Sequence, residues 1–180
     1  MNTLKIEVLE EKDFKQCKEL CNELMQFQKL KAHMGKEKFD TMNFETRMEP
    51  SYKNSLSNYV LLIKDKDISI GYLFCTINFS ENLKKSPFQL LPNWKNIPEK
   101  VGHINNLYFR DSYRGRGLGK KLINLSMEWF KNFSDVDLIL VHVSNGNDKA
   151  YDFYINNGFK FSHDILNGFI KCLFKYKEGQ

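Results

Sequence analysis

A glycine-rich, basic segment carries the clearest chemistry in the sequence. It reads Tyr113-Arg114-Gly115-Arg116-Gly117-Leu118-Gly119-Lys120-Lys121 and lies between an expected strand and an expected amphipathic helix. The first N–H groups of a helix are unpaired, and the helix dipole favours negative charge there. Glycines let a polyanion approach the main chain, and Arg114, Arg116 and Lys120 add cationic donors. The segment therefore predicts a phosphate or pyrophosphate site.

Two common nucleotide-binding motifs do not fit this segment. A Walker A loop requires Ser or Thr after Gly-Lys, but Lys121 follows Lys120, and Arg114 occupies the position of the first glycine. A dinucleotide fingerprint requires G-x-G-x-x-G, and its last position is Lys120 or Leu122 here. The alternative to a phosphate site is a turn with solvated basic side chains.

Two motifs resemble the signatures of one family. Arg114-x-x-Gly117-x-Gly119 is similar to the [QR]-x-x-G-x-[GA] motif of the GCN5-related N-acetyltransferases (GNAT). Asn147-x-x-Ala150-x-x-Phe153-Tyr154-x-x-x-Gly158-Phe159 resembles the second signature of that family. The two occur in the family's order, with one expected strand between them. The resemblance covers about residues 101–161.

The resemblance implies a fold and a cosubstrate. The fold is a single α/β domain over residues 1–180, with a mixed, mainly antiparallel sheet and helices on both faces. Strand 101–109 splays from strand 138–143, and acetyl-CoA inserts its pantetheine arm between them. Main-chain amides of the glycine-rich segment would bind the pyrophosphate, and Asn147 would contact the pantetheine. The implied cofactor-binding residues are Leu107, Tyr108, Phe109, Arg114, Gly115, Arg116, Gly117, Leu118, Gly119, Lys120 and Asn147.

The resemblance also implies a catalytic role for Tyr154. In the family, the tyrosine at this position lies near the thioester sulfur and acts as general acid for the departing thiolate. Amine attack on a thioester gives a tetrahedral intermediate that collapses more readily when the sulfur is protonated. A main-chain N–H of strand 101–109 would polarise the carbonyl. The alternative for Tyr154 is a half-buried structural residue beside Phe153.

An ammonium substrate must also lose a proton before it attacks. His103 lies eleven residues before Arg114, where several family members carry Glu or His, and histidine suits proton transfer near neutral pH. Relatives often have an acidic residue two positions further on, where this chain has Asn105 and Asn106. The candidates for the base are therefore His103, directly or through water, and bulk solvent. The alternative is a structural strand histidine.

The implied activity is direct acetyl transfer from acetyl-CoA to a primary amine in a ternary complex. A CoA-binding or regulatory module with little turnover is the alternative. The acceptor stays open among polyamines, aminoglycosides, amino acids and protein amines. A strongly cationic acceptor would require acidic side chains, for which Glu45, Glu49 and Glu81 are candidates. No metal is expected, and a homodimer is left open.

Hydrophobic periodicity predicts the elements that position these residues. Apolar alternation or continuous apolar runs predict strands at 4–9, 59–64, 68–79, 101–109, 138–143, 158–163 and 169–176. Helical spacing predicts helices over about 13–27, 36–48, 118–133 and 147–157. This order indicates one α/β domain with mixed strands. Residues 80–100 contain three prolines and predict a loop insertion, either a mobile lid or an insertion packed by its own aromatic residues.

Composition excludes several classes of protein. The 180 residues are 42% hydrophobic, which excludes general disorder, and no apolar run approaches the roughly 18 residues of a membrane span. A net charge of +5 is too small to indicate nucleic-acid binding. Most of this charge is local, since residues 110–121 hold five basic residues and one acid. The four cysteines have no C-x-x-C spacing and no secretory signal is expected, so we expect buried, reduced cysteines in a cytoplasmic protein.

Overall fold

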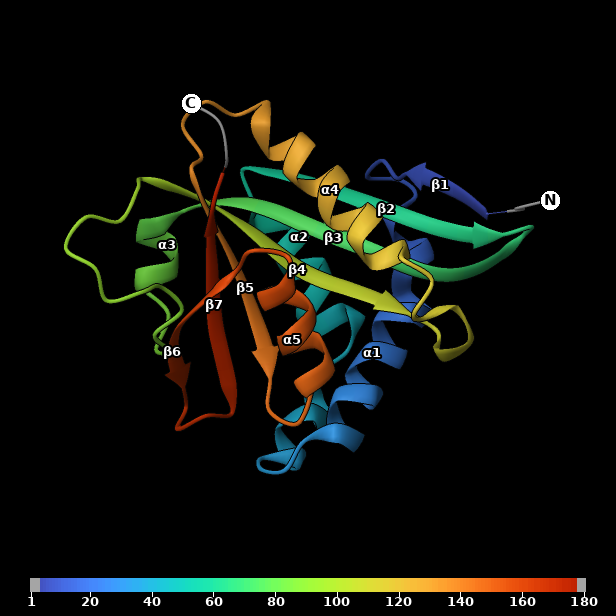
Figure 1. The fold of residues 1–180 in the computed structure, drawn as a ribbon, viewed down its shortest axis with the longest axis horizontal. Helices are drawn as coiled ribbons and strands as arrows, with labels where there is room; N and C mark the ends of the chain where they lie inside the picture. Colours follow the sequence, from blue (N-terminus) through green and yellow to red (C-terminus); the bar gives the residue numbers. More distant parts are fainter. Residues whose placement is uncertain (1–3, 178–180) are drawn as a thin grey trace.

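A seven-stranded sheet in the order β1-β2-β3-β4-β5-β7-β6 runs through the computed structural model, which describes residues 4–177 (Figure 1). All neighbouring strands are antiparallel except β4 and β5, which are parallel. This confirms the predicted mixed, mainly antiparallel sheet. The strands are β1 (Leu4–Val8), β2 (Ser57–Asp65), β3 (Ile68–Phe79), β4 (Lys100–Phe109), β5 (Leu138–Ser144), β6 (Lys160–Ile165) and β7 (Ile170–Tyr176).

Helices cover both faces of the sheet, as predicted. On one face, here the α1 face, Cys21 and Leu24 pack against Tyr72. On the other, the α5 face, Phe130 and Tyr154 join the core of the sheet, and Figure 1 shows α4 and α5 in front of the strands. The α-helices are α1 (Lys18–Lys31), α2 (Glu49–Asn54), α3 (Ser80–Lys84), α4 (Leu118–Lys131) and α5 (Asp148–Asn156). The shorter helical turns are η1 (Phe14–Cys17), η2 (Lys36–Thr41), η3 (Phe44–Met48) and η4 (Asp111–Tyr113).

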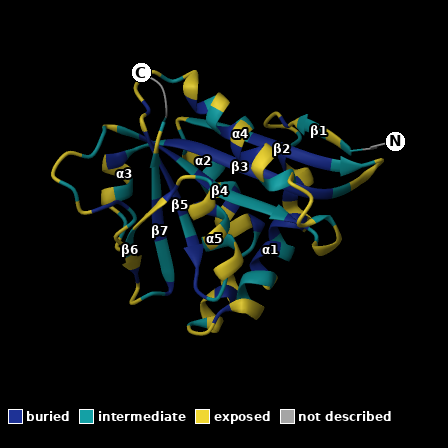
Figure 2. Ribbon diagram, viewed as in Figure 1, coloured by how far each residue is buried: buried dark blue, intermediate teal, exposed yellow. Residues whose placement is uncertain are grey.

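The burial of residues matches the packing of helices on both faces of the sheet. Figure 2 shows β3 and β5 buried over most of their length and the middle of β2 buried, whereas the exposed residues concentrate in loops and on outer helix faces. The four cysteines are free and buried, as the sequence predicted. None of the helices within residues 4–177 is long and apolar enough to cross a membrane.

The single helix predicted over residues 36–48 is wrong. The chain instead forms the 3-10 turn η2, the π-helical turn η3 and then α2. The side chains of Asn43 and Thr46 cap η3 reciprocally, which starts a new helical segment in the middle of the predicted one. Pro50 lies in the first turn of α2, where a missing N–H leaves no hydrogen bond unmade.

Residues 80–100 are packed against the sheet. After α3, Leu91 is buried with Val101 and Leu140, on the part of the α1 face that β5, β7 and β6 form. Trp94 meets Phe174 edge-to-face, with the ring centroids 4.6 Å apart. The segment therefore contributes aliphatic and aromatic side chains to the core on the α1 face.

The end of β5 is held directly against the end of α1. The Asn145 side chain accepts a hydrogen bond from the His33 N–H (2.6 Å) and donates one to the Phe169 carbonyl (3.1 Å). Gly146 follows with a φ of +76°, and a Cβ there would lie 1.9 Å from the carbonyl oxygen of Lys31. Only glycine fits this contact, so the residue pair 145–146 fixes α1, β5 and the turn before β7 together.

We expect Gly146→Ala to lower the free energy of unfolding by about 2–4 kcal/mol, because backbone strain and a main-chain clash add. Gly115→Ala is the matched control. Its φ of +72° is similar, but no heavy atom lies within 4 Å of the added Cβ. The control should lose only the conformational part, about 1–2 kcal/mol. Urea unfolding measures both, and equal losses would contradict the close contact at Gly146.

Candidate active site

The parallel strands β4 and β5 stay together over a short distance only. Their pairing joins Gly102–Ile104 to Ile139–Val141, and within the described chain no further residues pair across them. Figure 1 shows the two arrows diverging towards their C-terminal ends. The gap between residues 105–109 and 142–144, here the β4/β5 opening, is bordered by backbone groups without a strand partner on that side. The predicted splay is therefore confirmed.

A β-bulge lies where the opening begins. The register of β4 against β3 shifts by one residue at Asn105. The buried Thr76 hydroxyl donates to Asn105 Oδ1 (2.8 Å) and accepts from Asn78 Nδ2 (2.9 Å), which fixes the bulged residue. A bulge re-aims backbone groups next to it. Asn105 and Asn106 depart from the family pattern in sequence, but no sequence signal predicted the bulge.

The glycine-rich segment forms an open cradle beside the β4/β5 opening. Gly115 and Gly117 have φ values of +72° and +75°, and a Cβ on either would meet no heavy atom within 4 Å. Gly117 is the N-cap of α4, and the first helical hydrogen bond runs from Lys121 N–H to its carbonyl (3.2 Å). The N–H groups of Leu118 to Lys120 therefore have no partner within the helix. Left-handed glycines, free amides and space together fit a phosphate group.

The basic side chains of this segment differ in their surroundings. Arg114 Nε donates to the Phe109 carbonyl (2.7 Å), and its guanidinium lies 4.3 Å from the centre of the Phe27 ring. Arg114 also pairs with Asp111. These contacts hold the segment to β4 and α1. Lys120 is exposed and pairs with none of the described acids, so its charge is available to an anion.

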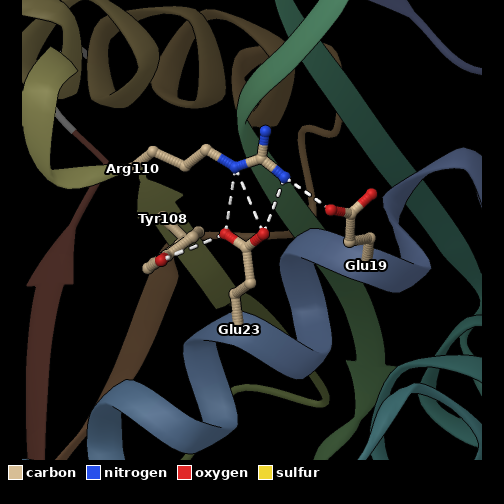
Figure 3. Close-up of polar contacts among 4 residues, drawn as sticks. All are labelled: Glu19, Glu23, Tyr108 and Arg110. Atoms are coloured by element: carbon tan, nitrogen blue, oxygen red, sulfur yellow. Dashed lines mark hydrogen bonds and ion pairs between the residues drawn. The ribbon is translucent and has the colours of Figure 1, made fainter.

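The C-terminal end of β4 is held by α1. The Glu23 carboxylate accepts hydrogen bonds from Arg110 Nη2 (2.6 Å) and Nε and from the Tyr108 hydroxyl (3.3 Å) (Figure 3). The Glu19 carboxylate accepts a further hydrogen bond from Arg110 Nη2 (2.8 Å). The guanidinium and the phenol thus share one carboxylate. These contacts tie the C-terminal end of β4, which no longer pairs with β5, to α1. No sequence pattern predicted them.

The predicted pantetheine-binding residues of β4 divide between the two faces. Leu107 and Phe109 pack in the core of the α5 face, whereas Tyr108 lies on the α1 face. On α5, Asn147 holds the N-cap position, but its side chain caps nothing, which leaves it available to a ligand. Gly119 approaches α5 closely, since a Cβ there would lie 3.1 Å from the Phe153 ring.

Tyr154 is fixed by the end of its own helix. Gly158 has a φ of +87°, and the Phe159 N–H donates to the Tyr154 carbonyl (3.1 Å), as in a Schellman motif. The hydrophobic contact of that motif joins the Phe159 and Tyr154 rings, with centroids 5.5 Å apart. Burial, with a smaller effect of Cys75, raises the pKa of Tyr154 well above its ordinary value. Tyr154 is therefore a neutral phenol at physiological pH.

His103 lies on the opposite face of the sheet. It alternates with Ile104, which faces α5, so His103 points to the α1 face. Its ring is 4.6 Å from that of His142, edge-to-face, and its buried Nε2 has no hydrogen-bond partner among residues 4–177. Burial, and then the charges of His142 and Arg47, lower the pKa of His103 well below 6.5. His103 is therefore a neutral imidazole whose Nε2 makes no hydrogen bond within the described residues.

His142 behaves as the satisfied core histidine that the sequence predicted. Its Nε2 bonds the Leu90 carbonyl (3.1 Å). Burial lowers the pKa of His142 to about 4. The structure thus places Tyr154 in the core of the α5 face and His103 on the α1 face, within the paired segment Gly102–Ile104 that precedes the opening.

A sheet that splays at its parallel pair, next to a glycine-rich helix start, defines the class of N-acetyltransferase folds. The comparison with family models agrees. The model described as the acetyltransferase (GNAT) family matches residues 19–159, so the chain belongs to that family. A comparison with curated proteins gives no match.

Solved structures of acetyltransferases share the fold. Arabidopsis thaliana Naa50, in complex with the bisubstrate analogue CoA-Ac-MVNAL, has 17% identity and a TM-score of 0.63, over 96% of this chain and 98% of its own. Arabidopsis thaliana NAA60 in complex with acetyl-CoA has 16% identity and a TM-score of 0.61, over 98% and 100%. The PaiA N-acetyltransferase from Thermoplasma acidophilum, in complex with coenzyme A, has 18% identity and a TM-score of 0.62, over 96% and 98%.

We expect the protein to lose stability as the pH falls from about 6.5 towards 4. An unfolded histidine has a pKa of about 6.5. The folded pKa of His142 is about 4 and that of His103 is also lowered, so the unfolded state binds more protons in this window. The free energy of unfolding then falls by about 1.4 kcal/mol per pH unit for each histidine that stays neutral only in the folded state.

Urea unfolding at several pH values measures this slope. His142→Gln should make it shallower, whereas replacement of the exposed His33 by Gln is the control and should leave it steep. A wild-type stability that stays constant between pH 6.5 and 5 would contradict the buried, neutral pair.

Proposed function

We propose that the chain is an acetyl-CoA-dependent N-acetyltransferase that acts on a primary amine. The observation that supports this most directly is the β4/β5 opening, which follows the paired segment Gly102–Ile104 and whose β4 border leads into the open glycine-rich cradle. On this proposal, residues 1–180 form one N-acetyltransferase domain and residues 80–100 are an insertion in it. Acetyl-CoA supplies an acetyl group activated as a thioester.

The chain's own groups suit each part of that cosubstrate. The N–H groups of Leu118, Gly119 and Lys120 bind the pyrophosphate, and Arg116 and Lys120 add positive charge. The free edge of Leu107–Phe109 pairs with the amides of the pantetheine arm, to which Asn147 contributes its side chain. Backbone groups that lack a strand partner are thus satisfied by the ligand.

Two side chains move the protons. Tyr154 donates its phenolic proton towards the sulfur as the acetyl group leaves it. His103 accepts a proton from the acceptor's ammonium group through its unused Nε2, directly or through water. A backbone N–H at the bulge of β4 polarises the acetyl carbonyl.

We expect Tyr154→Phe to reduce kcat by about 100-fold or more, because the leaving sulfur loses its proton donor. The dissociation constant for CoA, measured by calorimetry, should stay within a factor of two. Tyr151→Phe, one turn earlier on α5, is the matched control and should keep wild-type turnover. If Tyr154→Phe keeps full turnover, Tyr154 is not the acid. If no amine supports turnover but CoA binds, the chain is a CoA-binding module.

Gly117→Glu tests the phosphate cradle. The variant places a carboxylate where the proposed pyrophosphate sits, so we expect CoA affinity to fall at least 100-fold. Gly117→Ala imposes the same left-handed strain without the charge, and it should lose less than tenfold. Thermal unfolding of both variants shows whether they fold. Equal affinity of the two variants for CoA would contradict the cradle.

A further inference from the structure

A serine and a histidine meet at a bulge in the edge strand β6. Phe161 pairs with Leu173 on β7, and His163 pairs with Cys172. Ser162 lies between them and, within residues 4–177, has no partner residue on β7. A regular strand would send the side chains of two successive residues to opposite faces, whereas the bulge sets both opposite one residue of β7. Ser162 Oγ therefore lies 2.8 Å from His163 Nδ1.

The far side of the His163 ring decides which nitrogen carries the proton. His163 Nε2 lies 2.6 Å from the main-chain carbonyl oxygen of Gln89. A carbonyl oxygen only accepts, so Nε2 carries a hydrogen and donates it. The neutral ring then has its lone pair on Nδ1, to which the Ser162 hydroxyl donates. A hydroxyl, a basic ring nitrogen and an acceptor for the second ring nitrogen are the arrangement that activates a nucleophilic serine.

The surroundings of the Ser162–His163 pair leave room for a small molecule. Both side chains are half-buried. β6 is the last strand of the sheet, so its outer edge has no strand partner among residues 4–177, and main-chain N–H groups there are open to a carbonyl oxygen. Gln89, which holds His163, also lines a pocket of about 360 Å³ with Phe88 and Trp94 among its apolar walls. A pocket of this size suits a small ligand.

The Ser162–His163 pair lies apart from the β4/β5 opening. In the sheet order, β7 separates β6 from β5. Two strand spacings, about 10 Å, therefore lie between β6 and the β5 border of the opening. No step of the proposed acetyl transfer to an amine uses Ser162 or His163. An acyl donor would reach Ser162 from solution.

We propose that Ser162 is an acyl acceptor that reacts with small activated esters and thioesters, independently of the proposed acetyltransferase function. The hydroxyl oxygen attacks the carbonyl carbon of the donor while its proton passes to His163 Nδ1. The C–O or C–S bond of the donor then breaks, and the leaving group takes its electron pair and that proton. The products are an O-acyl serine and a free alcohol or thiol. The Gln89 carbonyl stabilises His163 while the ring carries the extra proton.

Peptide mapping by mass spectrometry tests the proposal after incubation with p-nitrophenyl acetate and, separately, with acetyl-CoA. We expect Ser162 to gain one acetyl group from each donor. Ser162→Ala should remove this modification. His163→Gln keeps an N–H donor towards Gln89 but has no basic nitrogen, so it should slow the modification about 100-fold or more. Ser69, a half-buried serine of β3 that contacts no histidine of residues 4–177, is the internal control and should stay unmodified.

The outcomes for Ser162 and for amine acetylation are independent of each other. Acetylated Ser162 without turnover of any amine would support the role of Ser162 and count against the proposed function. Amine turnover by a protein whose Ser162 stays unmodified with both donors would overturn the role of Ser162 and leave the proposed function intact. Equal rates of Ser162 modification in wild type and His163→Gln, or equal modification of Ser69, would also overturn it.

Discussion

The three-residue pairing of β4 with β5 is the constraint on which the rest of the structure depends. Buried backbone N–H and C=O groups are almost always hydrogen-bonded, so two strands that begin as partners tend to continue as partners. Here they separate after Ile104 and Val141. The separation persists because other contacts hold each strand from its far side.

The contacts that hold β4 differ in kind from those that hold β5. β4 stays with β3 and is tied to α1 through Arg110 and Glu23, a charged contact at the surface. β5 instead pairs along its whole length with β7 and ends at Asn145 and Gly146, which pack against backbone of the α1 C-terminus. α1 therefore touches both borders of the β4/β5 opening. A change in the position of α1 would alter the width of the opening, and α1 also contacts the glycine-rich segment, since the Arg114 guanidinium lies 4.3 Å from the centre of the Phe27 ring.

Local patterns predicted most of the fold and supplied the candidate site residues. The glycine-rich segment and the Tyr154 motif are contiguous in sequence, and their backbone requirements, such as left-handed Gly117 and Gly158, are visible as glycines. The bulge at Asn105 and the anchor at Glu23 could not be predicted in this way. Both depend on residues that meet only after the sheet has formed. The break at η3 was not predicted either, because in sequence the two residues of its capping box, Asn43 and Thr46, look like ordinary polar residues of a continuous helix.

Burial is the main cause that keeps the two proposed proton-transfer groups neutral. Removing a group from water disfavours its charged form, which raises the pKa of a phenol and lowers that of an imidazole. Tyr154 and His103 shift in these opposite directions, each with burial as the largest cause. Tyr154 thus stays a neutral phenol and His103 a neutral imidazole across the neutral range, and the charges of His142 and Arg47 add to the effect of burial on His103. A carboxylate beside His103 would raise its pKa and favour the protonated ring, so the asparagines at positions 105 and 106 are consistent with a neutral base.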